Sequence, residues 1–186
     1  MKILVKDITS IHTGLFAKPG GTGELVYLQS KHFNEYGQLH AVLYPELVAE
    51  GISEKHLLKD GDVLFAAKGT KNFAAVFENH NEPSVASTSF FVLRLFDQKV
   101  LPQYLVWFLN NPTTQKLLKT QAIGTSMPSI SKQVLENLEI PVPNLEIQKA
   151  ILKVFKLRDK EKALKRKIET LREKLIQQQI ENLIKI

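Results

Sequence analysis

The chain has 186 residues, of which 44% are hydrophobic, 24% charged and 8% aromatic, and this composition excludes wholesale disorder and collagen-like or low-complexity fibres. It contains no cysteine, which excludes a disulfide framework and a thiolate zinc site. The formal net charge of +6 at pH 7 favours a polyanionic partner. The apolar runs fall far short of the roughly 20 residues of a membrane span and the first residues do not resemble a signal peptide, so we expect a soluble, cytoplasmic protein with no membrane partner.

Short segments that are rich in β-branched and aromatic residues, and bounded by Gly, Pro, Asn and Asp, predict strands along the first 144 residues. These segments are residues 3–5, 25–29, 39–44, 63–67, 73–77, 87–96 and 138–142. Helices are predicted over residues 102–110 and 112–121, and a short third helix is predicted to begin at Ser131. Strands followed by clustered helices do not fit regular βαβ winding, so the predicted fold class is α+β.

Residues 145–186 contain none of the nine Gly and none of the eight Pro of the chain, which predicts one long helix. Asn144 is a good N-cap for it. This segment holds 12 basic and 6 acidic residues, whereas residues 1–144 hold 13 of each, so it carries the whole net charge. About 41 helical residues span roughly 60 Å, more than the width of a 144-residue domain. We therefore expect two domains, a globular one at 1–144 and a helical one at 145–186.

Apolar residues recur along the predicted helix at alternating steps of three and four, which is the pattern of a coiled coil. The residues that we expect at the pairing interface are Val154, Leu157, Leu164, Ile168, Leu171 and Leu175. Polar residues at 161, 178 and 182 share this seam, and a second apolar stripe at both ends of the helix indicates more than one packing partner. The alternative is a helix folded back on its own domain. For the basic run 165–167, a solvated face is favoured over a phosphate contact.

Three loops of the first 144 residues carry side chains suited to phosphates and base edges. The first, residues 18–23, lacks the Gly-Lys-Ser/Thr ending of a P-loop, and a flexible loop is the favoured interpretation. The second, residues 68–72, is either a DNA-contacting hairpin tip or a plain solvent-exposed turn. The third, residues 124–132, is dense in hydroxyl groups. The residues predicted to bind DNA are Lys18, Lys68, Thr70, Lys71, Asn72, Thr125, Ser126, Ser129 and Lys132.

Known catalytic patterns do not fit the sequence. Residues 124–128 lack the second Gly of a nucleophile elbow, and the five His show no metal-ligand spacing. No Gly-rich cofactor loop accompanies residues 110–113. We therefore predict no catalytic residue, no metal site and no cofactor, and favour a binding module over an enzyme. Two alternatives stay open: a self-contained nuclease or DNA-modifying enzyme, and a coiled-coil adaptor with no nucleic-acid role.

Four segments, in this order and followed by a long helix, resemble the DNA-specificity (S) subunits of type I restriction–modification systems, in a half-length form. The segments are Gly61-Asp62-Val63-Leu64-Phe65 with Lys68-Gly69; Leu101-Pro102-Gln103-Tyr104-Leu105-Val106-Trp107-Phe108-Leu109-Asn110; Gly124-Thr125-Ser126 with Ile130 and Leu138-Glu139-Ile140-Pro141-Val142-Pro143; and Leu145-Glu146-Ile147-Gln148-Lys149-Ala150-Ile151. No single motif is diagnostic, but the ordered set is fairly specific and spans most of the chain.

The resemblance implies a non-catalytic target-recognition domain carried on a helical spacer. It implies three partners: double-stranded DNA, an adenine-methyltransferase (modification) subunit, and a restriction subunit that supplies ATP-driven translocation and cleavage. Full-length family members carry two recognition domains and two helices that pair antiparallel, whereas this chain has one of each. We therefore expect a homodimer through the C-terminal helix, which would read a bipartite, palindromic site.

Overall fold

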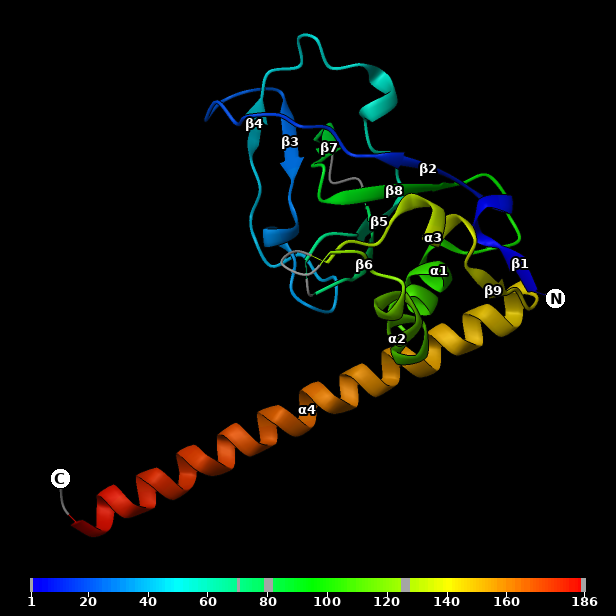
Figure 1. The fold of residues 1–186 in the computed structure, drawn as a ribbon. Coiled ribbons are helices and arrows are strands. Elements are labelled where there is room, and N and C mark those ends of the chain that lie inside the picture. The colour runs from blue at the N-terminus through cyan, green and yellow to red at the C-terminus, as the bar shows by residue number, and fades with distance from the viewer. Residues whose placement is uncertain (1, 70, 79–81, 125–127, 185–186) are drawn as a thin grey trace. The chain divides into compact units, whose positions relative to one another are not determined.

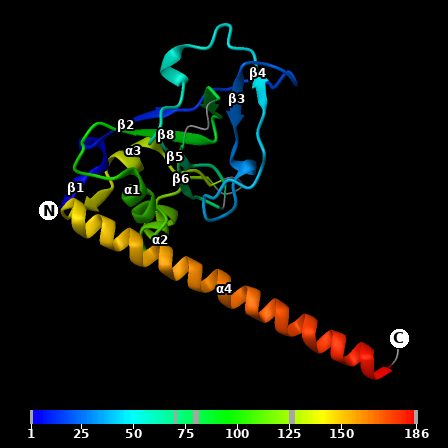
Figure 2. The ribbon, with the colours of Figure 1, turned by 180° about the vertical axis from the view of Figure 1, so that it is seen from behind.

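A computed structural model of the chain describes residues 2–69, 71–78, 82–124 and 128–184 (Figures 1 and 2). The chain divides into two units, Met1–Gln148 and Lys149–Ile186. The first unit mixes small sheets with short helices, and the second is helical. The predicted α+β class with a long C-terminal helix is therefore confirmed. In the described part of the chain, no helix is at once long and apolar enough to cross a membrane.

The central sheet of the first unit is antiparallel. Its strands, in spatial order, are β2 (Thr9–Thr13), β8 (Phe90–Leu95), β5 (Val63–Ala66) and β6 (Ala74–Val76). All four residues of β5 are buried, which is the expected state of a short, continuous apolar run in the middle of a sheet. Leu64 of this strand lies between Val92 of β8 and Ala75 of β6.

Two smaller sheets complete the strands of this unit. One has the order β4 (Pro45–Leu47), β3 (Leu25–Leu28) and β7 (Ser84–Ala86), with β3 and β7 parallel. The other pairs β1 (Lys2–Leu4) with β9 (Glu139–Pro141), so the two ends of the unit lie side by side. In both views β3 and β4 lie on the side of this unit away from the short helices (Figures 1 and 2).

An aromatic cluster joins the sheets of the first unit. The rings of Phe33, Phe73 and Phe90 lie 5.6–6.0 Å apart, and two of the three pairs meet edge to face, a geometry that aromatic quadrupoles favour. Leu64 and Val92 belong to the same buried cluster. The cluster contains residues of β5, β8 and the loops around them, and its packing holds these segments in place.

Helices α1 (Pro102–Leu109), α2 (Pro112–Thr120) and α3 (Lys132–Glu136) follow the strands. The first two begin with proline, whose fixed φ suits the first helical position. The side chains of Asn111 and Ser131 cap α2 and α3 by accepting a backbone N–H, which satisfies a donor that the helix itself leaves free. The three predicted short helices are thus present, at bounds close to those expected.

The second unit continues helix α4 (Leu145–Ile184), which has 40 residues and a length of about 60 Å. Asn144 caps it as predicted, because its Oδ1 accepts the N–H of Ile147 at 2.9 Å. From Lys149 to Ile184 every residue is exposed except the half-buried Ile151 and Leu152. The apolar seam of the helix is therefore uncovered in the single chain.

One predicted strand is wrong, and three strands of the structure, β2, β4 and β7, were not predicted. Residues 39–44 form no strand: Leu39 makes an isolated bridge to Phe33, and the chain pairs only from Pro45 onward. Val42 and Tyr44 are exposed, so their β propensity had no surface to pack against. The predicted strand 87–96 begins at Phe90, because a turn precedes it, while β7 and the polar β2 were not predicted.

Candidate nucleic-acid interface

The turn between β5 and β6 is held by backbone and side-chain hydrogen bonds. The ladder ends where Ala66 N donates to Phe73 O at 2.8 Å, and Asn72 Nδ2 donates to Ala66 O at 2.9 Å. Gly69 has φ +93°, a conformation that glycine adopts without strain. The buried Phe73 anchors one end of the turn in the core, and the turn leaves Lys68 and Lys71 exposed.

A second loop lies alongside this turn. Gly69 N donates to Pro128 O at 2.9 Å, and Ile130 N donates to Ala67 O at 2.9 Å, so Lys68 and Ser129 face each other as an antiparallel bridge. Loops that are some 60 positions apart in sequence are thereby placed side by side.

A third segment extends this arrangement. Ile123 and Ser129 exchange both backbone hydrogen bonds, at 3.0 and 2.9 Å. We call residues 67–69, 71–72, 122–124 and 128–132 the tip surface. It unites five of the residues predicted from sequence, namely Lys68, Lys71, Asn72, Ser129 and Lys132, the last at the start of α3.

Four further residues were predicted from the sequence to bind DNA. Thr70, Thr125 and Ser126 fall outside the described residues. Lys18 is exposed and belongs to the segment before β3, where Gly20 N donates to Glu46 O at 2.9 Å beside β4. The sheet of β3 and β4, and not the tip surface, positions Lys18.

Two lysines of the tip surface already have acidic neighbours. Lys71 Nζ lies 3.6 Å from Glu35 Oε2, and Lys132 Nζ lies 3.4 Å from Glu136 Oε1, with each of the four side chains about one-third exposed or more. Such exposed pairs contribute little and exchange readily for other anions. Lys68 makes no ion pair with any described residue, so it is the cation of this surface that is most available to a phosphate.

The side chain of Asn72 has fewer hydrogen-bonding groups available for DNA than the sequence suggested. One amide hydrogen is used on Ala66 O, and the side chain is half-buried. An asparagine that reads adenine needs both its amide donor and its carbonyl. The structure therefore gives Asn72 a role in closing the turn, and the second amide hydrogen and Oδ1 are the groups that it could offer to a base edge.

Ile123 was not singled out in the sequence, yet it is 72% exposed on the tip surface. Its backbone is fixed on both sides by Ser129, so the side chain is presented from a rigid position. Apolar side chains contact the thymine methyl group in the major groove. The signal in the sequence was an isoleucine between Ala122 and Gly124, in a stretch from 119 to 126 that is mostly polar.

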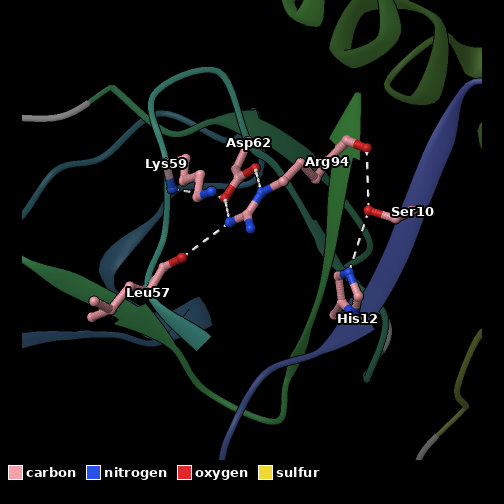
Figure 3. Close-up of polar contacts among 6 residues, drawn as sticks. All are labelled: Ser10, His12, Leu57, Lys59, Asp62 and Arg94. Atoms are coloured by element: carbon pink, nitrogen blue, oxygen red, sulfur yellow. Dashed lines mark hydrogen bonds and ion pairs between the residues drawn. The ribbon is translucent and has the colours of Figure 1, made fainter. Parts of the chain in front are cut away.

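The motif residue Asp62 holds the base of the β5 strand through an ion pair (Figure 3). Its side chain is 2% exposed, and Arg94 of β8 donates to both carboxylate oxygens, at 2.8 and 2.6 Å. Lys59 N donates to Oδ2 at 2.8 Å, and Arg94 also reaches Leu57 O at 3.0 Å. The hydrogen bond to Asp62 raises the pKa of Arg94 above its ordinary value, so the guanidinium stays charged.

On β2, which pairs with β8, Ser10 Oγ lies 3.5 Å from Arg94 O and 3.3 Å from His12 Nε2 (Figure 3). These contacts are long or exposed and carry little energy. In the described residues, no group of three or more His, Asp or Glu is placed to hold a metal ion.

Gln148, in the first turn of α4, is fully buried. Its Oε1 accepts Leu101 N at 3.0 Å, while its Nε2 donates to Lys99 O at 2.7 Å and to Pro143 O at 2.8 Å. One amide thereby joins the helix start to the segment before α1. Nearby, the hydroxyl of Tyr104 donates to Pro141 O at 2.7 Å, and burial raises the pKa of that phenol.

The described part of the first unit also contains a cavity of about 590 Å³ between β3, β6 and residues 33–43. Aromatic and aliphatic side chains line most of it, and Glu78 and Glu82 are among the lining residues. Carboxylates repel phosphate, so this cavity does not extend the tip surface.

Residues 16–171 match the family model described as "Type I restriction modification DNA specificity domain". The type I restriction enzyme MjaVIII specificity subunit of Methanocaldococcus jannaschii is 31% identical over 128 residues, which cover 67% of this chain and 28% of that protein. The putative type I restriction enzyme MjaX specificity subunit of the same organism is 28% identical over 116 residues, covering 60% and 27%. Each match thus spans less than a third of the relative.

Solved structures share the fold. The HsdS subunit from Thermoanaerobacter tengcongensis has a TM-score of 0.64 and 21% identity, covering 89% of this chain and 44% of that one. The type I restriction–modification S subunit from M. genitalium has a TM-score of 0.58 and 17% identity, covering 86% and 39%. At these identities the likeness concerns the fold.

Proposed function

The chain belongs to the family of type I restriction–modification DNA specificity domains, and from this membership we propose that it is the DNA-recognition subunit of a type I restriction–modification complex. The family match over residues 16–171 carries the proposal. On this proposal the chain itself is non-catalytic and chooses the target, while other subunits act on the DNA.

The tip surface supports a role in reading DNA. It presents exposed lysines suited to phosphates, the hydroxyl of Ser129, and the apolar Ile123 on one backbone platform. Phosphate contacts fix the position of a protein on the duplex, while base-edge contacts specify the sequence. We assign the lysines at 68, 71 and 132 to phosphate, and Ile123 and Ser129 to the groove. Lys18, Thr70, Asn72, Thr125 and Ser126 remain candidates.

We assign residues 1–144 to target recognition and residues 145–186 to pairing. The seam of α4 keeps its apolar side chains exposed in the single chain, with values from 49% for Ile168 to 66% for Val154. Burying such a stripe against a second helix recovers hydrophobic free energy of about 25 cal/mol for each Å² removed from water. A second copy of the chain is the simplest supplier of that helix.

Pairing about a twofold axis would give the dimer two identical target-recognition domains. A symmetric dimer recognises a symmetric site, so the proposed target consists of two inverted half-sites with a gap between them. An adenine-methyltransferase subunit and a restriction subunit would dock on this dimer. The methyltransferase would have to flip its target base out of the duplex.

The test is to co-express the chain with an adenine methyltransferase of a type I system and to map the methylated adenines. We expect methylation at one gapped, palindromic sequence, and none when either protein is omitted. Methylation of an asymmetric sequence would contradict the homodimer, and random or absent methylation would contradict the specificity role.

A second assay separates this proposal from an enzyme. The purified chain is incubated with duplex DNA and either Mg²⁺ or S-adenosylmethionine. We expect neither cleavage nor methylation. Activity of the chain alone would favour a self-contained nuclease or DNA-modifying enzyme. Dimers that are not retained on duplex DNA or heparin would favour the coiled-coil adaptor.

A further inference from the structure

The side chains that flank the seam of α4 are all basic over the middle of the helix. With Val154, Ile168 and Leu175 at heptad positions a, and Leu157, Leu164 and Leu171 at positions d, the e and g positions lie beside the seam. Between residues 153 and 174 these flanking residues are Lys153, Arg158, Lys160, Lys165, Lys167, Arg172 and Lys174. All seven are exposed, and no acidic residue occupies a flanking position between them.

The two flanks differ in how far acidic neighbours on the same helix neutralise them. On the e side, Lys165 Nζ lies 2.7 Å from Glu161 Oε1, and this contact lowers the pKa of Glu161, so the carboxylate stays charged. Arg158 and Arg172 each have a glutamate three positions away, Glu161 and Glu169 respectively, within reach on a helix surface.

The g side has no such compensation. Its lysines, which we call the lysine row, are Lys153, Lys160, Lys167 and Lys174. None of them has an acidic residue three or four positions away in the sequence, so no acid on the same helix face can pair with it. Neighbours in the row are seven residues apart, which is about 10.5 Å along the helix.

Antiparallel pairing would bring two such rows together on one face. When Leu164 packs against Ile168 of a second copy, Leu157 meets Leu175, and Lys167 lies beside its own symmetry mate. Lys153 then faces Glu181, so charges attract at the ends and repel in the middle. Like charges across the flanks destabilise a coiled coil. Anions that bind near the twofold axis would therefore reduce the repulsion between the lysines and stabilise the pair.

We propose that the lysine row binds phosphates of the DNA between the two half-sites. This inference rests on the proposed function. The twofold axis of a palindromic site coincides with that of the dimer that reads it, so the middle of the gap and the middle of the helix pair share one axis. The paired rows are centred on that axis, and phosphate is the anion that duplex DNA supplies there. Such contacts bind the DNA between the half-sites without reading its sequence.

The test compares two triple variants that remove the same charge from α4. One is Lys160→Gln, Lys167→Gln and Lys174→Gln, in the lysine row. The matched control is Lys156→Gln, Lys162→Gln and Arg166→Gln, three exposed residues away from the seam. Circular dichroism checks that both keep the helix content of the wild type. Binding of the full-length chain to a fluorescent duplex of about 40 base pairs, of arbitrary sequence, is then titrated between about 50 and 200 mM NaCl, where salt competes strongly with phosphate binding.

We expect the lysine-row variant to bind the duplex at least tenfold more weakly at low salt. The slope of log affinity against log salt should fall by about 0.9 for each phosphate that is no longer bound. The control should keep an affinity and a slope close to those of the wild type. In sedimentation without DNA, the lysine-row variant should dimerise more tightly than the wild type, because self-repulsion is reduced. Equal weakening of both variants would overturn the proposal, because net charge alone would then explain it.

Three further outcomes keep the inference apart from the proposed function. If the lysine-row variant binds duplex like the wild type but no longer retains the methyltransferase subunit, an acidic protein surface occupies the row and the proposal is wrong. If the wild type directs site-specific methylation and the variant shows unchanged duplex binding, only this inference fails. If the wild type directs no site-specific methylation, the proposed function fails first.

Discussion

At the scale of single residues, buried polar side chains do more for this fold than the exposed ones that we assign to DNA recognition. Asp62 directly precedes β5 of the central sheet and has Arg94 of β8 as its counter-charge, and Gln148 satisfies three backbone groups at once. Removing one member of a buried pair costs more than the pair itself contributes, because the other charge stays buried and unpaired.

Arg94→Met tests the ion pair. It leaves the buried Asp62 carboxylate without the guanidinium that balances its charge, so we expect the free energy of unfolding to fall by about 3–5 kcal/mol. Urea denaturation followed by tryptophan fluorescence measures it. Lys55→Met, at an exposed position, is the control and should change little. The double variant Asp62→Leu with Arg94→Met should recover part of the loss, and a double variant less stable than Arg94→Met would argue against unpaired charge as the cause.

Gln148→Leu tests the anchor of the long helix. The substitution keeps the volume similar but removes the partners of Leu101 N, Lys99 O and Pro143 O, at a cost of about 1–3 kcal/mol for each buried group left unpaired. Thermal unfolding of the full chain measures the loss, with the exposed Gln177→Leu as the matched control. Equal melting temperatures for the two variants would show that the three hydrogen bonds contribute nothing.

His32 makes stability depend on pH. Burial, and then the charge of Lys31, lower its pKa below the ordinary value of 6.5, and its Nδ1 accepts the N–H of Gln29 at 3.2 Å. The folded state therefore favours the neutral ring, so this contribution is complete above about pH 6.5 and is lost as the pH falls through the lowered value. Between about pH 7 and pH 5, the range in which this ring takes up its proton, the wild type should lose more stability than His32→Gln. Parallel pH profiles would refute the assignment.

At the scale of elements, the two interfaces that we propose are built differently. The tip surface consists of three short segments held by backbone hydrogen bonds, so single side chains on it can change without loss of the platform. The seam of α4 is a single periodic stripe, so one charged residue in its middle affects the whole pairing surface.

Ile168→Asp tests the seam. Burying a carboxylate in the middle of the helix pair is costly, so the dimer should dissociate at least a hundredfold more readily in analytical ultracentrifugation. Lys162→Asp, on the other side of the helix, controls for the loss of helix propensity and for the added acid. Dimers of unchanged stability in the Ile168→Asp variant would place the pairing interface elsewhere.

At the scale of the whole molecule, DNA affinity should come from many separated cations. Substituting Lys68, Lys71 and Lys132 by Gln should weaken binding of the assembled complex to all sequences alike and flatten the salt dependence by about 0.9 for each phosphate released. Ile123→Ala should instead relax the preference at one base position by roughly 1–3 kcal/mol. Methylation unaltered by the triple substitution would mean that the tip surface does not face DNA.

The sequence by itself determined the parts of this protein that depend on local signals. The long helix follows from the absence of Gly and Pro after Asn144, its start from the capping side chain, and the short helices from similar boundaries. The order of the four motif segments was enough to indicate the family, which the match over residues 16–171 confirms. Strands with a continuous apolar run, such as β5, were found for the same reason.

Only the tertiary structure decided which distant residues meet. It placed Lys68 against Ser129 and Asp62 against Arg94, turned Asn72 toward the hairpin backbone, and left residues 39–44 without a strand partner. These outcomes depend on which surfaces are available for pairing and burial. Such non-local contacts leave no periodic trace in the chain, because the energy of a buried ion pair or a strand bridge belongs to both partners and to the packing that brings them together.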